Sequence, residues 1–232
     1  MKIIKQLIVY LCKKMGLAVY RDFKVPDGNL NLFALGVRAL NKTQLTVVQI
    51  GAFDGELCDP LRNLLTYPHL RVLFVEPQPE AFRKLKLLYT GRPGTLFENS
   101  AIGDFDGTAK MYLEKNTLSS PLASLDRNHL TRFGIDPSEA SSINVQVIRV
   151  ESLLKRHQIE QVDVLQVDTE GFDYKIVTQF LESGFVPKII NFERLHLDKK
   201  ERVEILRRLE QHHYCFQDHG YDTFAIQREL LN

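Results

Sequence analysis

Val47-Val48-Gln49-Ile50-Gly51-Ala52-Phe53-Asp54-Gly55 is the segment from which we infer the fold. It joins an apolar strand, predicted over residues 45–50, to a glycine-rich turn and then to a helix predicted over 56–65. Glycine adopts positive φ angles at little cost and lets a ligand approach the main chain closely. The helix N-terminus adds free N–H groups. This order indicates an α/β domain with a ligand site at the turn, although such a turn can also be purely structural.

The spacing of the two glycines and the acidic residue between them narrow the choice of ligand. Turns that hold the pyrophosphate of a dinucleotide follow the pattern G-x-G-x-x-G. Here Gly51 and Gly55 are separated by three residues, one of which is Asp54. An acidic side chain repels a pyrophosphate, but it can pair with the amino group of a methionine-like ligand. The turn therefore favours an amine-bearing ligand over a dinucleotide.

Outward from this turn, apolar strands alternate with amphipathic helices. Strands are predicted over residues 71–76, 96–102, 145–150, 162–167 and 188–193, and helices over 30–40, 79–88, about 172–181 and 199–210. Residues 214–217 and 223–226 can form a closing antiparallel pair, and 107–113 an added strand or hairpin arm. Residues 114–142 are polar and are expected to form a lid or a substrate loop. This alternation is typical of a parallel sheet covered by helices on both faces.

Residues suited to a nucleoside follow the next two strands. Glu76, which precedes Pro77, ends the second strand about 20 residues after the glycine turn, where a carboxylate accepts hydrogen bonds from ribose hydroxyls. Asn99, Ser100 and Ala101 end the third strand and can line a flat adenine slot. The alternatives are a helix cap for Glu76 and an ordinary strand end for the other three residues.

Carboxylates also gather at the ends of two later strands. Asp168 and Glu170 follow the strongly apolar strand at 162–167, and Glu193 with His196 follows the strand at 188–193. In an open α/β sheet these strand ends face the ligand crevice. Crowded carboxylates raise one another's pKa, which suits general-base catalysis, and they can also hold a hard divalent cation. Helix capping by Asp168 or Glu170 and a surface position for His196 are the alternatives.

The composition excludes several classes of protein and leaves the N-terminal segment open. A net charge of +1 over 232 residues argues against a nucleic-acid binder with a broad basic face. The three scattered cysteines argue against a zinc knuckle, and no apolar run is long enough to cross a membrane. Residues 1–20 have the pattern of a basic amphipathic helix, which packs on the domain or a partner chain, or lies on an anionic membrane. We expect a helical extension over 1–40, a single domain over 41–232, and a cytoplasmic protein.

Six segments, in order, resemble the FkbM-family methyltransferases: Gly51-Ala52-Phe53-Asp54-Gly55, Asp59-Pro60, Val75-Glu76-Pro77-Gln78-Pro79, Asn99-Ser100-Ala101-Ile102, Asp168-Thr169-Glu170-Gly171-Phe172-Asp173 and Phe192-Glu193-x-x-His196. The resemblance extends from about Val47 to Ala225. It implies a class I methyltransferase, Rossmann-like fold: a mostly parallel seven-stranded sheet with one antiparallel strand and helices on both faces. It also implies S-adenosylmethionine as cofactor and O-methylation of a hydroxyl on a sugar, glycan or secondary metabolite.

The resemblance further implies a role for each matching residue. Gly51, Ala52, Asp54 and Gly55 would surround the methionine part of the cofactor, Glu76 followed by Pro77 would hold the ribose, Ser100 and Ala101 would flank the adenine, and Asp168, Glu170, Glu193 and His196 would face the acceptor. Gln49 departs from the pattern, because many class I enzymes carry an acidic residue there. Its amide can still bind the cofactor, and Asp54 is a candidate substitute for the missing charge.

The expected reaction is transfer of the sulfonium methyl group to an acceptor oxygen. An aliphatic hydroxyl needs a base such as His196 or Asp168, or a divalent metal held by Asp168, Glu170 and Glu193. We favour the reaction without metal. The expected partner is a small-molecule or glycan acceptor and not a nucleic acid. The alternatives are a nicotinamide-dependent oxidoreductase, against which the glycine spacing argues, and a non-catalytic module that binds a nucleoside cofactor.

Overall fold

The computed structural model describes residues 40, 44–57, 61 and 69–231. The extension predicted over residues 1–40 lies almost wholly outside the described residues, as does most of the helix predicted over 56–65. Within the described part of the chain, no helix combines the length and apolar character that crossing a membrane requires.

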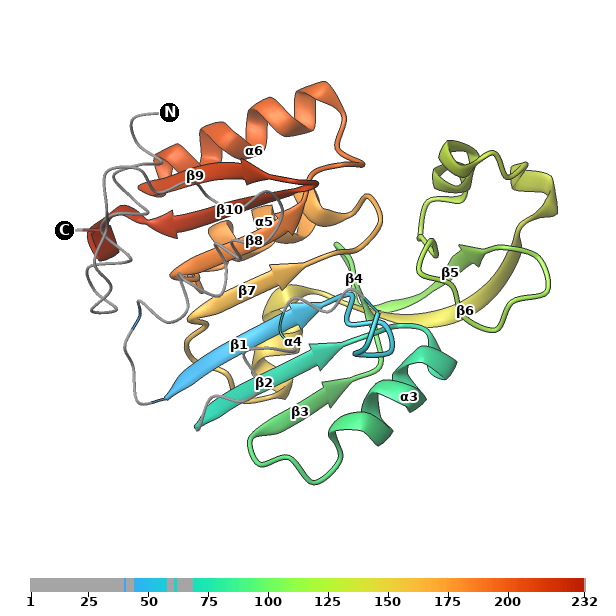
Figure 1. The fold of residues 1–232 in the computed structure, drawn as a ribbon, viewed down its shortest axis with the longest axis horizontal. Coiled ribbons are helices and arrows are strands. Elements are labelled where there is room, and N and C mark those ends of the chain that lie inside the picture. The colour runs from blue at the N-terminus through green and yellow to red at the C-terminus, as the bar shows by residue number, and fades with distance from the viewer. Residues whose placement is uncertain (1–39, 41–43, 58–60, 62–68, 232) are drawn as a thin grey trace, which may run out of the picture.

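A seven-stranded sheet forms the centre of the molecule (Figure 1). Its strands lie in the order β3 (Thr95–Glu98), β2 (Leu70–Val75), β1 (Leu45–Ile50), β7 (Val164–Val167), β8 (Ile189–Glu193), β10 (Asp222–Gln227) and β9 (Tyr214–His219). Only β10 runs antiparallel to its neighbours within this sheet. This arrangement confirms the predicted mostly parallel sheet and its closing antiparallel pair.

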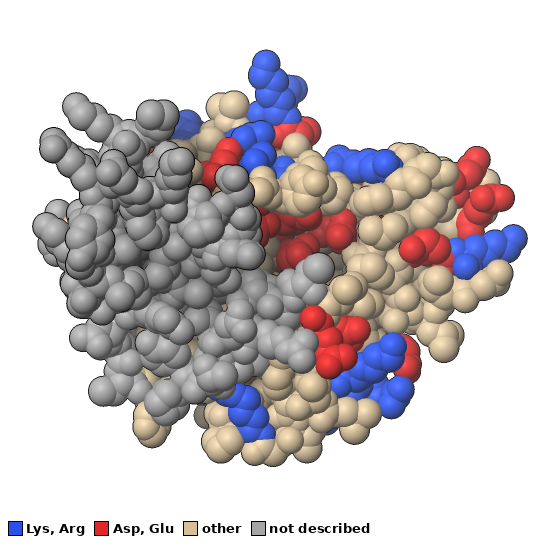
Figure 2. Space-filling view, viewed as in Figure 1, with Lys and Arg blue, Asp and Glu red and all other residues tan. Residues whose placement is uncertain are grey.

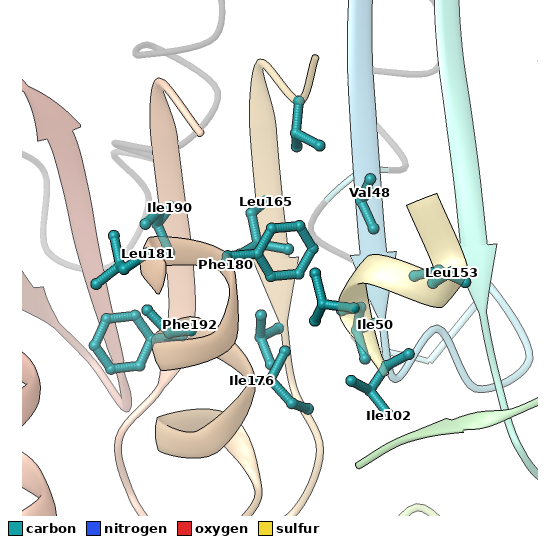
Figure 3. Close-up of a cluster of buried hydrophobic side chains, with 14 of the residues drawn as sticks. Val48, Ile50, Ile102, Leu153, Leu165, Ile176, Phe180, Leu181, Ile190 and Phe192 are labelled. Atoms are coloured by element: carbon teal, nitrogen blue, oxygen red, sulfur yellow. The ribbon is translucent and has the colours of Figure 1, made fainter. Parts of the chain in front are cut away.

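Helices cover both faces of the sheet, as the sequence predicted. Helix α3 (Pro79–Tyr89) packs on one face, and α4 (Val150–Arg156), α5 (Asp173–Glu182) and α6 (Lys199–Gln211) pack on the other. Successive strand residues point to opposite faces of the sheet. Val48 and Ile50 therefore pack on the face covered by α4, α5 and α6, and Val47 packs on the face covered by α3. Figure 3 shows Ile176 and Phe180 of α5 against these strands. Their full burial contributes roughly 1.5–3 kcal/mol per side chain.

Two predicted strands differ from the structure by more than two residues at one end. The strand predicted over 96–102 is divided into β3 and the separate β4 (Ala101–Ile102), and between them the Asn99 side chain donates to the carbonyls of Glu76 and Pro77. The strand predicted over 145–150 belongs to β6 (Ser141–Ile148), and α4, which was not predicted, begins at Val150. The amide of Val150 donates to the Gln179 side chain of α5, a contact that no local pattern reveals.

The lobe, which we define as residues 107–148, lies beyond the C-terminal ends of β1, β2 and β7 (Figure 1). It contains β5 (Gly107–Leu113), the 3-10 helices η1 (Arg127–Phe133) and η2 (Pro137–Glu139), and β6. Strands β4, β6 and β5 form a second sheet, which confirms the added strand at 107–113. Gln78 anchors the lobe to the main sheet through its side chain. Gln78 Nε2 donates to the main-chain carbonyl of Ser120 at 3.0 Å, and Gln78 Oε1 accepts from the main-chain N–H of Ser120 at 2.7 Å.

Candidate functional site

A cavity of about 410 Å³ opens at the C-terminal ends of β1, β2, β7 and β8, between the main sheet and the lobe. Figure 2 shows acidic side chains gathered in the hollow at the centre of this face. Most of the predicted site residues line the cavity: Gln49, Gly51, Ala52, Glu76, Pro77, Ser100, Ala101, Asp168, Glu170 and Glu193. Asp54, Gly55 and His196 are not among its lining residues. The structure therefore brings ten of the thirteen predicted residues to one cavity.

The turn after β1 requires glycine at its first position. Gly51 has a φ of +80°, and the amides of Gly51 and Ala52 both donate to the carbonyl of Val75 at the end of β2. An ideal Cβ on Gly51 would lie 1.7 Å from the carbonyl oxygen of Asp168. The glycine turn and the loop that carries the acidic pair are thus in direct main-chain contact.

Asp54 and Gly55 serve the turn and not the cavity wall. The Asp54 carboxylate accepts hydrogen bonds from the amides of Glu56 and Leu57, both at 3.0 Å. A Cβ on Gly55 would meet side-chain atoms of Leu85 and Tyr89 at 2.8 Å. Both residues thus have a structural role in the turn, and the expectation that Asp54 replaces the acidic residue missing at position 49 stays a prediction.

Glu76 presents a buried carboxylate to the cavity from the end of β2. Its side chain is 2% exposed, and its two oxygens accept hydrogen bonds from the amides of Phe53 at 2.9 Å and Gln78 at 2.8 Å. Burial raises the pKa of Glu76 to about 7, although these two hydrogen bonds oppose the shift. The carboxylate is therefore held in one orientation, with its remaining lone pairs free for ligand hydroxyls.

Ser100 and Ala101 occupy the cavity wall next to Glu76, where the sequence predicted a flat slot. The Ser100 hydroxyl donates to Glu98 at 2.6 Å, and Glu98 also contacts His157 and Arg156 of the α4 region. The hydroxyl therefore fixes the chain at the slot and is not directed to a ligand by this contact. Because the side chains of Ser100 and Ala101 are small, an adenine at this position would contact the main chain closely.

The acidic wall, defined as Asp168, Glu170, Glu193 and Asp222, forms the other side of the cavity. Asp168 is open to the cavity but is surrounded by protein on its other sides, so burial, and then Glu170 and Asp222, raise its pKa to about 7. Burial, then Asp168 and Glu170, raises the pKa of Glu193 to about 9. Burial also acts on Glu170, but hydrogen bonds from His129 and His196 outweigh it and lower its pKa. At neutral pH, Glu193 is therefore protonated while the neighbouring Glu170 is ionised.

Three amide side chains form a row beneath the acidic wall. Gln49, Gln166 and Asn191 occupy the same register on β1, β7 and β8. The Asn191 amide donates to Gln166 and to Asp222, both at 2.9 Å. Gln49 and Gln166 also line the cavity. Through Asn191, the row connects Asp222 to the side chains of the sheet by hydrogen bonds. The sequence analysis identified Gln49 but not Gln166 or Asn191.

His196 lies behind the acidic wall in a cluster with His129 and Glu170. Both Nε2 atoms lie close to the same Glu170 oxygen, that of His129 at 2.9 Å and that of His196 at 3.0 Å. Among the residues that the structure describes, two groups have ligand atoms close enough to hold a metal ion: His129 with Glu170 and His196, and Asp168 with Glu170 and Glu193. His129 was missed because its lobe segment shows neither apolar periodicity nor a motif.

We expect the free energy of unfolding to fall as pH rises from about 5 to 9. Glu76, Asp168 and Asp173 have pKa values of about 7 and Glu193 of about 9, so the folded state keeps protons that the unfolded chain has released. Their stabilising contribution is complete below the ordinary carboxyl pKa and is lost as pH passes 7 and then 9. Urea unfolding across this range measures it.

Glu193→Gln is the matched variant for this pH dependence. It keeps the shape of the protonated side chain and removes its titration, so the decline above about pH 7 should become shallower. A stability maximum at about pH 8 or above in the unsubstituted protein would contradict the expectation.

Comparison with known proteins was made on sequence and on structure. The family described as Methyltransferase FkbM domain matches residues 49–222, whereas no curated protein matches the chain. Among solved structures, the methyltransferase FkbM from Methylobacillus flagellatus KT is 15% identical with a TM-score of 0.49, covering 79% of this chain and 43% of that one. The Methanococcus jannaschii fibrillarin pre-rRNA processing protein is 14% identical with a TM-score of 0.44, covering 90% and 86%. A SAM-dependent O-methyltransferase from Thermotoga maritima is 11% identical with a TM-score of 0.43, covering 94% and 71%.

The chain spans less than half the length of the Methylobacillus flagellatus protein. The family match, by contrast, covers most of the chain and includes the glycine turn, Glu76 and the acidic wall in one continuous segment. The sheet order, with β10 as its single antiparallel strand, is that of the class I methyltransferase fold. The chain therefore belongs to the FkbM family of S-adenosylmethionine-dependent methyltransferases.

Proposed function

We propose that the protein methylates a hydroxyl group of a sugar, glycan or secondary metabolite. The observation that carries this proposal is that Asp168, whose carboxylate has a pKa of about 7, lines the same cavity as Gly51, and its main chain lies against the glycine turn. A general base is most effective when its pKa lies near the working pH. The expected base and the expected cofactor turn thus share one cavity.

The residues of the cavity suit the cofactor that the family uses. Gly51 and Ala52 line the cavity, and the Glu76 carboxylate beside them is oriented by two main-chain amides. Gly51, Ala52 and Gln49 would hold the methionine part, Glu76 the ribose, and Ser100 with Ala101 the adenine. S-adenosylmethionine, when bound, supplies an electrophilic methyl group on a positively charged sulfur.

The chain's own residues supply proton removal and orientation. Asp168 takes the proton from the acceptor hydroxyl, and Glu170, ionised beside it, accepts a hydrogen bond from the acceptor. Glu193, protonated at neutral pH, can donate a hydrogen bond. His196 does not line the cavity, so we assign the role of base to Asp168.

The character of the wall supports a neutral acceptor that is rich in hydroxyls. Among the described residues that line the cavity there are five carboxylates and no Lys or Arg: the carboxylates are Glu76, Asp168, Glu170, Glu193 and Asp222. The ionised members of this wall, Glu170 above all, repel anionic acceptors such as sugar phosphates. Tyr221 also lines the cavity with its side chain 68% exposed, which offers an aromatic face to a sugar ring.

Screening with labelled S-adenosylmethionine tests the proposal. Neutral glycans and hydroxylated metabolites should accept the label, and their phosphorylated counterparts should not. Thermal shifts with S-adenosylhomocysteine and with NAD separate a methyltransferase from an oxidoreductase. Stabilisation by S-adenosylhomocysteine without transfer to any hydroxyl acceptor would favour the non-catalytic module.

Glu76→Gln should weaken S-adenosylhomocysteine binding by about 10-fold to 100-fold. Glutamine has one acceptor oxygen, whereas both Glu76 oxygens accept main-chain N–H groups, so the new NH₂ would face an N–H donor. Isothermal titration calorimetry measures the affinity. Glu80→Gln, in the first turn of α3 and outside the cavity lining, is the control and should bind normally. Equal affinities for the two variants would remove Glu76 from the ribose site.

A further inference from the structure

A chain of four side chains links the lobe to the acidic wall. His129 and Arg132 come from η1, Glu170 from the loop after β7, and His196 from the loop after β8. Both histidine Nε2 atoms contact Glu170 Oε2, and Arg132 Nη1 lies 2.7 Å from the His196 carbonyl and 3.3 Å from its Nδ1. His129 is 3% exposed and His196 is 7% exposed. The two imidazole rings meet edge to face with centroids 4.5 Å apart.

The arginine determines which nitrogen of His196 carries the proton. A guanidinium group has only donors, so the Nδ1 that faces it must accept. In a neutral imidazole the proton then lies on Nε2, which faces Glu170 Oε2 and donates to it. His129 Nε2 faces the same oxygen and donates in the same way. Two N–H groups therefore converge on one carboxylate oxygen.

The main chain at Glu170 needs this support. Glu170 has a φ of +54°, a conformation that costs energy in a residue other than glycine. Ser124 of the lobe also donates to the Glu170 carbonyl at 3.0 Å. The lobe thus fixes both the main chain and the side chain of a residue on the cavity wall.

Resting on the proposed function, we propose that His129 and Arg132 are positioning residues: Arg132 sets the tautomer of His196, and the two histidines hold Glu170 Oε2 so that Glu170 Oε1 is the oxygen presented to the acceptor. His196 does not line the cavity and would act through Glu170, which it contacts. The acceptor cavity is complete only when the lobe is docked on the loop after β7.

The same geometry decides between this hydrogen-bonded role and a metal site at the histidines. A histidine that binds a metal through Nε2 has its proton on Nδ1, where it donates to an acceptor. His196 Nδ1 faces a guanidinium donor instead, so its Nε2 carries a proton and has no lone pair for a metal ion. The contact with Arg132 therefore favours the hydrogen-bonded arrangement.

Nitrogen NMR of the full chain with ¹⁵N-labelled histidine tests the proposal without an acceptor. His196 should show a protonated Nε2 and an unprotonated Nδ1, and Arg132→Met should change the His196 Nδ1 signal. Arg127→Met is the matched control, since Arg127 lies on the same 3-10 helix and donates to the Pro137 carbonyl. A protonated Nδ1 in the unsubstituted protein, or selective binding of added Zn²⁺ by His129 and His196, would overturn the proposal.

A pair of substitutions at His129 separates positioning from folding. His129→Gln keeps a donor near Nε2, whereas His129→Leu removes it. With an acceptor in hand, the leucine variant should lose about 10-fold or more in kcat, with little change in the KM for S-adenosylmethionine, and the glutamine variant should recover most of the loss. Equal kcat values for all three proteins would overturn the positioning role and leave the proposed function intact. If no hydroxyl acceptor is ever methylated, the proposed function fails, and the NMR result still decides the histidine arrangement.

Discussion

Asp168→Asn should lower kcat by about 100-fold to 10,000-fold while leaving the affinity for S-adenosylhomocysteine within about threefold. Asparagine keeps the shape of the side chain but cannot take a proton from the acceptor. Only the side chain changes, so the main-chain contact between Asp168 and the glycine turn is retained. Methyl transfer under saturating cofactor and acceptor, together with calorimetry for the cofactor product, measures both quantities.

The same variant should be more stable than the unsubstituted protein above about pH 7. Burial, Glu170 and Asp222 raise the pKa of Asp168 to about 7, so ionisation at that position opposes folding. Removing the charge relieves this repulsion, and lost activity with gained stability is typical of an active-site charge. Asp136→Asn is the control, because this exposed aspartate caps η2 away from the cavity and should leave kcat unchanged. Near-normal turnover in Asp168→Asn would exclude Asp168 as the base, and Glu193→Gln would then be tested.

The sequence predicted the sheet well because the information that specifies it is local. Each parallel strand is a short apolar run that ends in a polar or glycine residue, as at Ile50-Gly51, Val75-Glu76 and Val167-Asp168. A parallel strand buried on both faces needs such a run, and its end then marks the crevice. Ten of the predicted site residues reach the cavity for this reason.

The lobe's part of the site was not predictable because it depends on contacts between distant segments. His129 meets Glu170 across 41 positions of sequence, and Arg132 meets His196 across 64. Neither residue lies in an apolar period or at a strand end. Asp54 shows the reverse case: its acidic side chain suggested a ligand contact, and in the structure it accepts from the amides of Glu56 and Leu57 and is not among the cavity-lining residues.

Gly51→Ala should reduce the free energy of unfolding by more than about 3 kcal/mol and abolish binding of S-adenosylhomocysteine. Two effects act together. The φ of +80° is unfavourable for alanine, and the added Cβ would lie 1.7 Å from the Asp168 carbonyl oxygen, so the two loops must separate. Separation displaces both the cofactor turn and the proposed base. Urea unfolding and calorimetry with S-adenosylhomocysteine measure the two losses.

Gly184→Ala separates the cost of the left-handed backbone conformation from the cost of the steric clash. Gly184 follows α5 with a φ of +81°, nearly the same as that of Gly51, but a Cβ there would meet nothing within 4 Å. This variant should therefore cost only the left-handed conformation, about 1–2 kcal/mol, and should bind S-adenosylhomocysteine normally. The difference between the two variants measures the close approach of the loops after β1 and β7. Equal destabilisation of both would mean that the glycine turn does not touch the loop of Asp168, and the proposed base would no longer lie beside the cofactor turn.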